Sequence, residues 1–200
     1  MSCHAWCIIN PLMKAYHDQE WGVPLHDDRA LFEFLMLEAL QCGLSWDLIL
    51  KKRAALKEAF RGFDPIPIAA FGERDVARIM ATDGVIHSER KIRAVIKNAQ
   101  AYLAIAKEYG SFDRYLWGYT KGKPLFYKGH GTGTLPTANG LSRAISRDLK
   151  KRGFSFVGPV TIYSYLEAVG VINDHDESCP RYKALFSLSD AVWADPFEES

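Results

Sequence analysis

Residues 27–46 read DDRALFEFLMLEALQCGLSW, and this stretch decides the fold. Between positions 29 and 41 the apolar side chains recur at the three- and four-residue spacing of a helix with a buried face. Asp27 and its neighbour Asp28 precede that pattern as N-terminal caps. Ser45 fits the N-cap of a second helix, which we expect over residues 45–61. The stretch therefore predicts two helices joined by a short turn.

The same periodicity continues through most of the chain. It predicts further helices over Glu73–Thr82, Ser88–Tyr109, Phe112–Tyr119, Ala138–Arg152 and Pro159–Val169. Residues 160–163 have a β-like composition, but Pro159 at the first position and the length up to Gly170 favour a buried helix. Strand signals are otherwise few, so the sequence predicts an all-α fold. Residues 121–137 form the one long irregular stretch, expected to be a mobile insertion.

Length and composition indicate a globular protein. A chain of 200 residues can bury a core without disulfides, so we expect a single domain over residues 1–200, built as two intimate helical lobes. A hydrophobic content of 48% excludes a disordered chain, and four cysteines are too few for a disulfide framework. The sequence shows neither a signal peptide nor a membrane-spanning run, which predicts a cytoplasmic protein with reduced thiols.

The net charge argues against a strongly basic domain, which is the simplest signature of a nucleic-acid-binding protein. The charged residues are nevertheless unevenly distributed along the chain. The 25 Lys and Arg residues nearly balance 24 Asp and Glu, leaving a net charge of +1. Residues 51–61 and 143–152 nevertheless each hold five basic residues against one acidic residue. A balanced total can therefore hide a basic face, and phosphate binding depends on the local field.

The two ends of the chain hold candidate metal ligands. Cys3, His4, Cys7 and His17 lie near the start, and His175 and Cys179 lie near the end. The last two are four residues apart, a spacing that puts both on one face of a helical turn. Two ligands from each end would form a closed tetrahedral zinc site that joins the termini. The alternative is a hydrogen-bonded histidine beside free, buried cysteines.

Two glutamates lie in the apolar helix of the opening stretch. Glu33 is expected to be an exposed surface residue, and on composition alone Glu38 would be one too. If Glu38 is buried, desolvation raises its pKa. Trp6, Tyr16 and Trp46, together with Trp21, lie in the same part of the chain. These aromatic residues either pack in the core or, with a carboxylate among them, form a pocket for a flat cationic ligand.

Two turns between helices could contact DNA. The first, Gln41–Trp46, contains Gly43 and an apolar Leu44, which is either an ordinary interhelical turn or a wedge between base steps. The second, Leu149–Pro159, contains two glycines around a short apolar hairpin, follows basic residues and precedes a helix N-terminus. Backbone N–H groups at such a terminus can hold a phosphate. The alternative is an ordinary turn between two helices.

Taken in order, motifs over almost the whole chain match one family. They are Pro11-Leu12, Tyr16-His17-Asp18, Glu20-Trp21-Gly22-Val23-Pro24, Leu37-Glu38, Gly43-Leu44-Ser45-Trp46, Lys151-Arg152-Gly153-Phe154, Phe156-Val157-Gly158, Asn173-Asp174-His175 and Cys179. In this order they closely resemble the 3-methyladenine DNA glycosylase I family. The resemblance implies a fold of the helix-hairpin-helix glycosylase superfamily, with the hairpin at residues 153–158 and one structural zinc ion.

The resemblance also implies an activity and a set of site residues. The protein would flip out 3-methyladenine from alkylated double-stranded DNA and release it by hydrolysis, without a lyase step, as a monomer. Glu38 would be the catalytic residue and, with Trp6, Tyr16 and Trp46, would hold the flipped base. The residues implied to contact DNA are Gln41, Gly43, Leu44, Gly153, Phe154, Val157 and Gly158. The alternatives are a glycosylase with a different range of alkylated bases and a non-catalytic, zinc-stabilised DNA-binding module.

The chain departs from the family pattern at two positions. The implied zinc ligands are His17, His175, Cys179 and a residue two positions before Trp6. That position is His4 here, and a cysteine stands one residue earlier. We predict His4 as the fourth ligand, with Cys3 as the alternative, since either side chain suits zinc. A family tyrosine is Met13 here, which is expected to thin one wall of the pocket.

Overall fold

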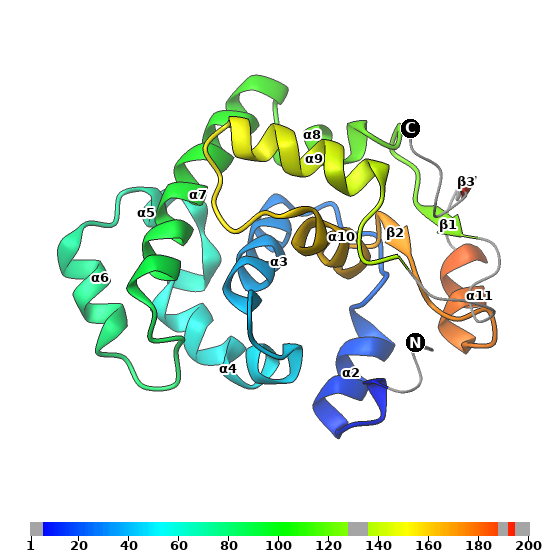
Figure 1. Cartoon of the computed structure of the whole chain (residues 1–200), viewed down its shortest axis with the longest axis horizontal. Helices are drawn as coiled ribbons and strands as arrows, with labels where there is room; N and C mark the ends of the chain where they lie inside the picture. The colour runs from blue at the N-terminus through cyan, green and yellow to red at the C-terminus, as the bar shows by residue number, and fades with distance from the viewer. Residues whose placement is uncertain (1–5, 128–135, 188–191, 195–200) are drawn as a thin grey trace.

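The computed structural model describes residues 6–127, 136–187 and 192–194. These residues are mostly helical, as the sequence predicts (Figure 1). The helices are α2 (Pro11–Gln19), α3 (Asp28–Gln41), α4 (Trp46–Ala59), η1 (Arg61–Phe63), α5 (Pro65–Ala69), α6 (Glu73–Met80), α7 (Glu89–Tyr109), α8 (Phe112–Gly118), α9 (Gly140–Lys151), α10 (Pro159–Ala168) and α11 (Pro180–Ser187). The strands are β1 (Leu125–Tyr127), β2 (Ile172–Asn173) and β3 (Val192–Ala194). Within the described residues, none of the helices combines the length and apolar composition that crossing a bilayer requires.

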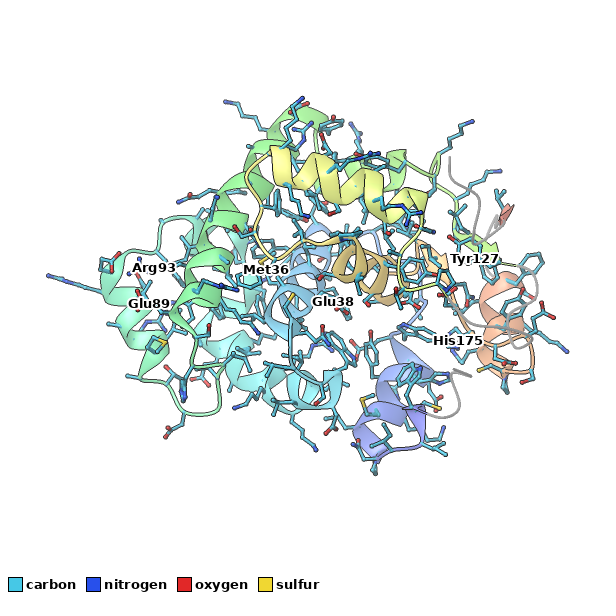
Figure 2. The ribbon with its side chains drawn as sticks, viewed as in Figure 1. Met36, Glu38, Glu89, Arg93, Tyr127 and His175 are labelled. Carbon is cyan, nitrogen blue, oxygen red and sulfur yellow. The ribbon has the colours of Figure 1, made fainter. Side chains whose placement is uncertain are left out.

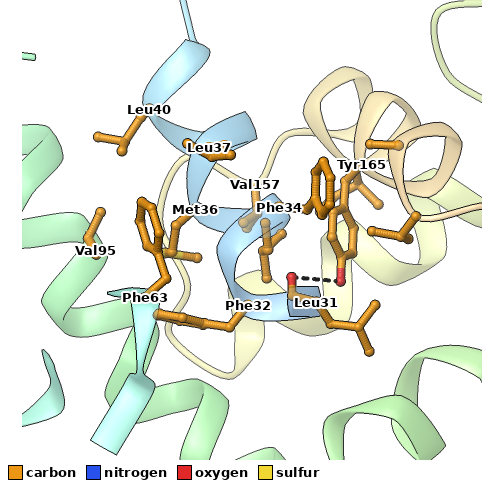
Figure 3. Packing of buried hydrophobic residues seen from close by; sticks show 14 of the residues in the cluster. Leu31, Phe32, Phe34, Met36, Leu37, Leu40, Phe63, Val95, Val157 and Tyr165 are labelled. Atoms are coloured by element: carbon orange, nitrogen blue, oxygen red, sulfur yellow. Dashed lines mark hydrogen bonds between the residues drawn. The ribbon is translucent and has the colours of Figure 1, made fainter. Parts of the chain in front are cut away.

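Helix α3 is the centre of the core. All residues from Leu31 to Leu40 are buried, and helices α4, α7, α8 and α10 pack around them. Met36 and Glu38 accordingly lie in the middle of the molecule (Figure 2). In the close view of this packing, the Tyr165 hydroxyl donates a hydrogen bond to the carbonyl oxygen of Leu31 at 3.2 Å (Figure 3). A helix buried on all sides needs such neighbours, because no face of it is left for water.

The helix boundaries follow from the caps that the sequence contains. The Asp27 carboxylate accepts a hydrogen bond from the Ala30 amide at 2.8 Å, and the Ser45 hydroxyl accepts one from the Leu48 amide at 3.2 Å. These bonds begin α3 and α4 by satisfying amides that have no partner inside the helix. Pro159 occupies the first turn of α10, so residues 160–163 are helical, as predicted.

The described part of the chain also contains a small sheet, which the all-α prediction lacked. Strand β1 is its middle strand and pairs in parallel with both neighbours, Leu125 lying opposite Ile172 on one side and Val192 on the other. Strand β1 falls inside the stretch 121–137, which was expected to be irregular. Residues 128–135 of that stretch lie outside the described residues, so its predicted mobility is untested.

The prediction for Glu33 was wrong, because this side chain is buried rather than exposed. Its carboxylate accepts hydrogen bonds from Arg53 Nε and Lys57 Nζ of α4, both at 2.8 Å. Arg53 also donates to Glu20 at 2.6 Å and covers the Phe34 ring at 5.0 Å from its centroid. Burial alone would raise the pKa of Glu33, but the two basic partners outweigh burial and lower it.

Glu33→Gln is therefore expected to lower the free energy of unfolding by about 3 kcal/mol, because it leaves a partly buried arginine with one fewer anionic partner. A depressed pKa stabilises the fold above the unfolded pKa, so the difference from the wild type should shrink as the pH falls below about 4.5. Urea unfolding at pH 7 and pH 4 measures both effects. Glu89→Gln, which removes an exposed ion pair with Arg93, is the control and should cost less than about 1 kcal/mol. Equal effects would contradict the assigned role of Glu33.

Candidate active site

A pocket of about 260 Å³ lies between the N-terminal segment, α3 and α10. Its walls hold aromatic rings, two carboxyl groups and few other polar side chains. The lining residues are Trp6, Met13, Tyr16, Trp21, Glu38, Gln41, Trp46, Ser164 and Glu167. The four residues implied to hold the base, Trp6, Tyr16, Glu38 and Trp46, are thus brought together. An apolar concave site with a few convergent polar groups is the usual form of a small-molecule site.

Glu38 is the buried carboxyl group of this pocket and is 4% exposed. Removal from water raises its pKa from 4.5 to about 8. Among the described residues no basic side chain forms an ion pair with it. The neighbouring glutamate Glu33 has two such partners, so the two residues differ in role although they share a helix. A buried carboxylate without a counter-charge favours a ligand that brings positive charge or hydrogen-bond donors.

The aromatic rings form a continuous wall beside Glu38. Tyr16 lies 5.3 Å from Trp46 and 6.1 Å from Trp6, and Trp6 lies 5.1 Å from Trp21, all measured between ring centroids. The indole Nε1 of Trp46 is buried and has no hydrogen-bond partner within the described residues. Burial, and then the charge of Glu38, raises the pKa of Tyr16 well above its usual value. The wall can stack on a flat ring, and Trp46 can donate to it.

Sequence reasoning missed Ser164 and Glu167, which enter the pocket from α10. Burial raises the pKa of Glu167 well above its usual value, and the negative charges of Asp174 and Glu38 raise it further. Asp174 in turn accepts a hydrogen bond from the Tyr163 hydroxyl at 2.6 Å. The signal that singled out Glu38, a carboxylate in an otherwise apolar helix, is also present at Glu167 and could have found it.

The turn between α3 and α4 borders the pocket. Gln41 lines the pocket, and its Nε2 donates to the Leu44 carbonyl at 2.8 Å. Gly43 has a φ of +80°, a conformation that favours glycine. Leu44 is half-buried and packs against the core. Lys91 Nζ donates to the carbonyls of residues 40 and 42 at 2.6 and 2.7 Å, which holds the turn in place.

The turn between α9 and α10 contains the two predicted glycines. Two of its residues that were predicted to contact DNA, Phe154 and Val157, are buried in the core. Gly153 has a φ of +99° and ends α9, and Gly158 precedes the first residue of α10. Phe154 and Val157 are 4% and 1% exposed. Their side chains therefore hold the turn against the core, and only their backbone remains for an outside contact.

Three of the predicted metal ligands form one buried group. His17, His175 and Cys179 place their donor atoms within 4.8 Å of one another. Cys179 Sγ lies 3.7 Å from both His17 Nε2 and His175 Nδ1. Burial lowers the pKa of His175 to about 4, which keeps its ring neutral. The predicted fourth ligand, His4, and its alternative Cys3 lie outside the described residues.

This group fits a tetrahedral zinc ion. Zinc bonds of about 2.3 Å to sulfur and 2.05 Å to nitrogen, at a tetrahedral angle, place the two donors about 3.6 Å apart. The other ring nitrogen of each histidine faces an oxygen: His17 Nδ1 lies 2.8 Å from Asp18 Oδ1, and His175 Nε2 lies 3.1 Å from the carbonyl of Trp21. Such outer contacts orient metal-binding imidazoles. Asp174, the residue before His175, accepts a hydrogen bond from the Tyr163 hydroxyl and raises the pKa of Glu167.

Comparison with known proteins identifies the family. The methyladenine glycosylase family model matches residues 6–182. DNA-3-methyladenine glycosylase 1 of Escherichia coli (strain K12) is 42% identical over 177 residues, which are 88% of this chain and 95% of that protein. DNA-3-methyladenine glycosylase of Haemophilus influenzae is 41% identical, over 82% of this chain and 89% of that protein.

A solved structure agrees with these relatives. The structure described as the basis of 3-methyladenine recognition by 3-methyladenine DNA glycosylase I from Staphylococcus aureus has a TM-score of 0.82 to this chain and 41% sequence identity. The match covers 86% of this chain and 92% of that one. Sequence motifs, fold and pocket therefore point the same way, and the chain belongs to the methyladenine glycosylase family.

Proposed function

We propose that this protein is a DNA-3-methyladenine glycosylase of base-excision repair, which hydrolyses the N-glycosidic bond of 3-methyladenine in alkylated DNA. The observation that carries the proposal is the buried carboxyl group of Glu38 facing a wall of aromatic rings in a pocket that a single base can fill. The relatives named for this activity support it. The family membership favours an enzyme over a non-catalytic DNA-binding module.

The chemistry needs little acid catalysis. Methylation at N3 gives the adenine a positive charge, so the glycosidic bond is already weak. When it breaks, the base keeps the electron pair and leaves neutral, while water supplies the hydroxyl group at C1′ and releases a proton. Glu38 binds the cationic base through charge and hydrogen bonds, and Tyr16 and Trp46 stack against it. No lysine is among the described pocket residues, which supports a reaction without a lyase step.

DNA binding is assigned to the two turns beside the pocket. Gln41, Gly43 and Leu44 would fill the space that the flipped base leaves in the duplex. The turn at residues 153–158 would hold backbone phosphates as the hairpin of a helix-hairpin-helix motif, between α9 and α10. The division of the chain into two intimate helical lobes stays a prediction. That the protein acts as a monomer in the cytoplasm stays a prediction.

Base release tests the proposal directly. Purified protein should release free 3-methyladenine, detected by chromatography, from DNA treated with a methylating agent. Parallel assays for 3-methylguanine and 7-methylguanine measure the substrate range, since Met13 stands where the family has a tyrosine and lines the pocket. An absence of 3-methyladenine release by folded protein would overturn the proposed function.

The metal group is proposed to bind one structural zinc ion through His17, His175, Cys179 and His4 from the N-terminal segment. Bound zinc would stabilise the fold and supply no chemistry to the base pocket, because four protein ligands leave no position for a water. The group ties the segment that carries Trp6, Tyr16 and Trp21 to the region after β2.

Cys179→Ser is expected to lower the zinc content from about one ion per chain to less than about 0.2, since a hydroxyl is a poor substitute for a thiolate. Zinc at 1,000 times its Kd raises the free energy of unfolding by about 4 kcal/mol. The variant, which no longer binds zinc, should therefore unfold at a Tm that is roughly 8–16 °C lower. Metal analysis and thermal melting measure these changes. His87→Ala, at an exposed histidine, is the control. An unchanged zinc content in Cys179→Ser would contradict the assignment.

A further inference from the structure

A second cleft lies on the surface beside the turn that joins α9 and α10. It has a volume of about 540 Å³ and is lined by Arg90, Arg93, Ala94, Lys97, Ser155 and Phe156. The three basic residues come from α7 at spacings of three and four, so they form one row along a helix face. Ser155 and Phe156 come from the turn and form the opposite wall.

Two of these cations are available to a ligand. Arg93 is already bound, since its guanidinium contacts Glu73 and Glu89 at 2.6 and 2.7 Å; Figure 2 labels Arg93 and Glu89. Arg90 and Lys97 are exposed, and neither forms an ion pair with a carboxylate in the part of the chain that the structure describes. The guanidinium of Arg90 instead lies over the Phe156 ring, 4.8 Å from its centroid.

The basic run 51–61, which the sequence suggested as a DNA-facing surface, differs in this respect. Lys51 pairs with Asp47, while Arg53 and Lys57 bind Glu33. Lys52 donates to the carbonyls of residues 84 and 85 at 3.1 Å. Most of the basic residues of that run are therefore bound by groups of the protein itself, whereas Arg90 and Lys97 of the cleft have no carboxylate partner among the described residues.

The cleft is rigid where it meets the turn. Asn98 is fully buried, and its side-chain amide donates to the Ser155 carbonyl at 3.0 Å and accepts from the Ser155 amide at 2.8 Å. Phe156 has a φ of +58°, and its carbonyl lies 3.9 Å from Cys42 Sγ. Cys42 follows Gln41, which lines the base pocket. The turn that forms one wall of the cleft thus contacts the turn that borders the base pocket.

We propose that Arg90 and Lys97 form a phosphate-binding cleft for the backbone of the DNA strand that passes the mouth of the base pocket. The inference rests on the proposed function and adds a contact outside the two turns. Seven residues of helix separate the two cations by about 10.5 Å along the axis of α7, which is longer than a single phosphate group. Each cation can therefore bind a separate phosphate of one strand, with Phe156 on the opposite wall of the cleft.

Binding to an undamaged 20-base-pair duplex tests the cleft. Arg90→Gln combined with Lys97→Gln should weaken binding about tenfold at 50 mM salt. The slope of log K against log salt should fall by about 1.8, which amounts to a roughly 12-fold smaller loss of affinity between 50 and 200 mM salt. The matched control is Lys123→Gln with Lys183→Gln, two exposed lysines near β1 and on α11, at the opposite end of the molecule from α7 (Figure 1). A slope equal to that of the wild type, or an equal fall in the control, would overturn the proposal.

Single neutral linkages locate the contact. In duplexes with one methylphosphonate at each position around an abasic site, a phosphate that touches Arg90 should weaken binding of the wild type when neutralised but leave the Arg90→Gln variant unaffected. Additive effects at every position would overturn the proposal.

Binding of free 3-methyladenine, measured by tryptophan fluorescence, separates the proposed phosphate-binding cleft from the proposed function of the base pocket. Loss of this binding in the double variant would show a disturbed pocket and would also overturn the cleft. If the wild type binds duplex through the cleft but releases no base, the proposed function fails and the cleft stands.

Discussion

Glu38→Gln is expected to lower the single-turnover rate of 3-methyladenine release about 10²- to 10³-fold. The variant keeps the shape of the side chain but loses the charge that faces the cationic base. A charge-assisted hydrogen bond and an ion–ion contact in a site shielded from water together account for about 3–4 kcal/mol, and each 1.4 kcal/mol is tenfold in rate. Quenched reactions on DNA with a single 3-methyladenine would measure this single-turnover rate. A rate equal to that of the wild type would remove Glu38 from the mechanism.

The pH profile provides a separate test of the same residue. Because burial holds the pKa of Glu38 at about 8 in the free enzyme, kcat/KM for the cationic substrate should rise with pH and level off above about 8. The limb in kcat should lie at lower pH, since a bound cation favours the carboxylate. The Glu38→Gln variant should lack this limb. An identical limb in the variant would assign it to another group.

The contribution of Glu38 to the stability of the wild type should fall over the pH range in which kcat/KM rises. A carboxyl group with a raised folded pKa contributes its full stability below the unfolded value near 4.5, and this contribution is lost as the pH rises to about 8. Glu38→Gln should therefore unfold at the same temperature as the wild type, or a higher one, at pH 8. A large fall in Tm would mean that the loss of activity reflects misfolding rather than chemistry.

Two substitutions of Trp46 should separate stacking from hydrogen bonding. Trp46→Phe removes the buried N–H, which has no partner within the described residues, and should weaken binding of free 3-methyladenine about fivefold, or about 1 kcal/mol. Trp46→Ala also removes the stacking surface and should weaken it about 100-fold, or about 3 kcal/mol. Calorimetry measures both affinities.

The matched control is Trp117→Phe, the same chemical change at a buried indole. Trp117 donates to the Leu25 carbonyl at 2.9 Å and lies outside the pocket. The Trp117→Phe variant should have a lower free energy of unfolding and an unchanged affinity for free 3-methyladenine. Equal affinities for Trp46→Phe and the wild type would show that the Trp46 N–H does not contact the base.

Periodicity and caps predicted the helices whose signal is local. Asp27, Ser45 and Pro159 mark the starts of three helices. These signals lie in the local sequence and do not depend on how the helices pack. Helix α2, by contrast, has Asn10 as its N-cap and a mixed pattern, because its buried residues include His17 of the metal group as well as Met13 and Tyr16 of the core. Strand β1 depends on β2 and β3, which are distant in sequence, so three residues of pattern could not predict it.

For the site, residue patterns predicted a metal group and an aromatic pocket only as one of two alternatives each, and the family resemblance was needed to choose between them. Glu33 and Glu38 lie in one apolar helix, and only the positions of Arg53 and Lys57 on α4 distinguish them. Glu167 and Ser164 reach the pocket because α10 packs on α3. The place of Ser164 in the pocket is a tertiary fact that no local pattern contains, whereas Glu167 carries a local signal as the one carboxylate in an otherwise apolar helix.

The long sequence separation of the metal ligands has a consequence for folding. His17 and Cys179 are 162 residues apart, so their group closes a loop that spans most of the chain. Loop-closure entropy makes such contacts late, after local helices have formed. During synthesis, His17 leaves the ribosome long before its partners. The wall of Trp6, Tyr16 and Trp21 should therefore be the last part of the pocket to order, and the enzyme should acquire base binding only when its chain is nearly complete.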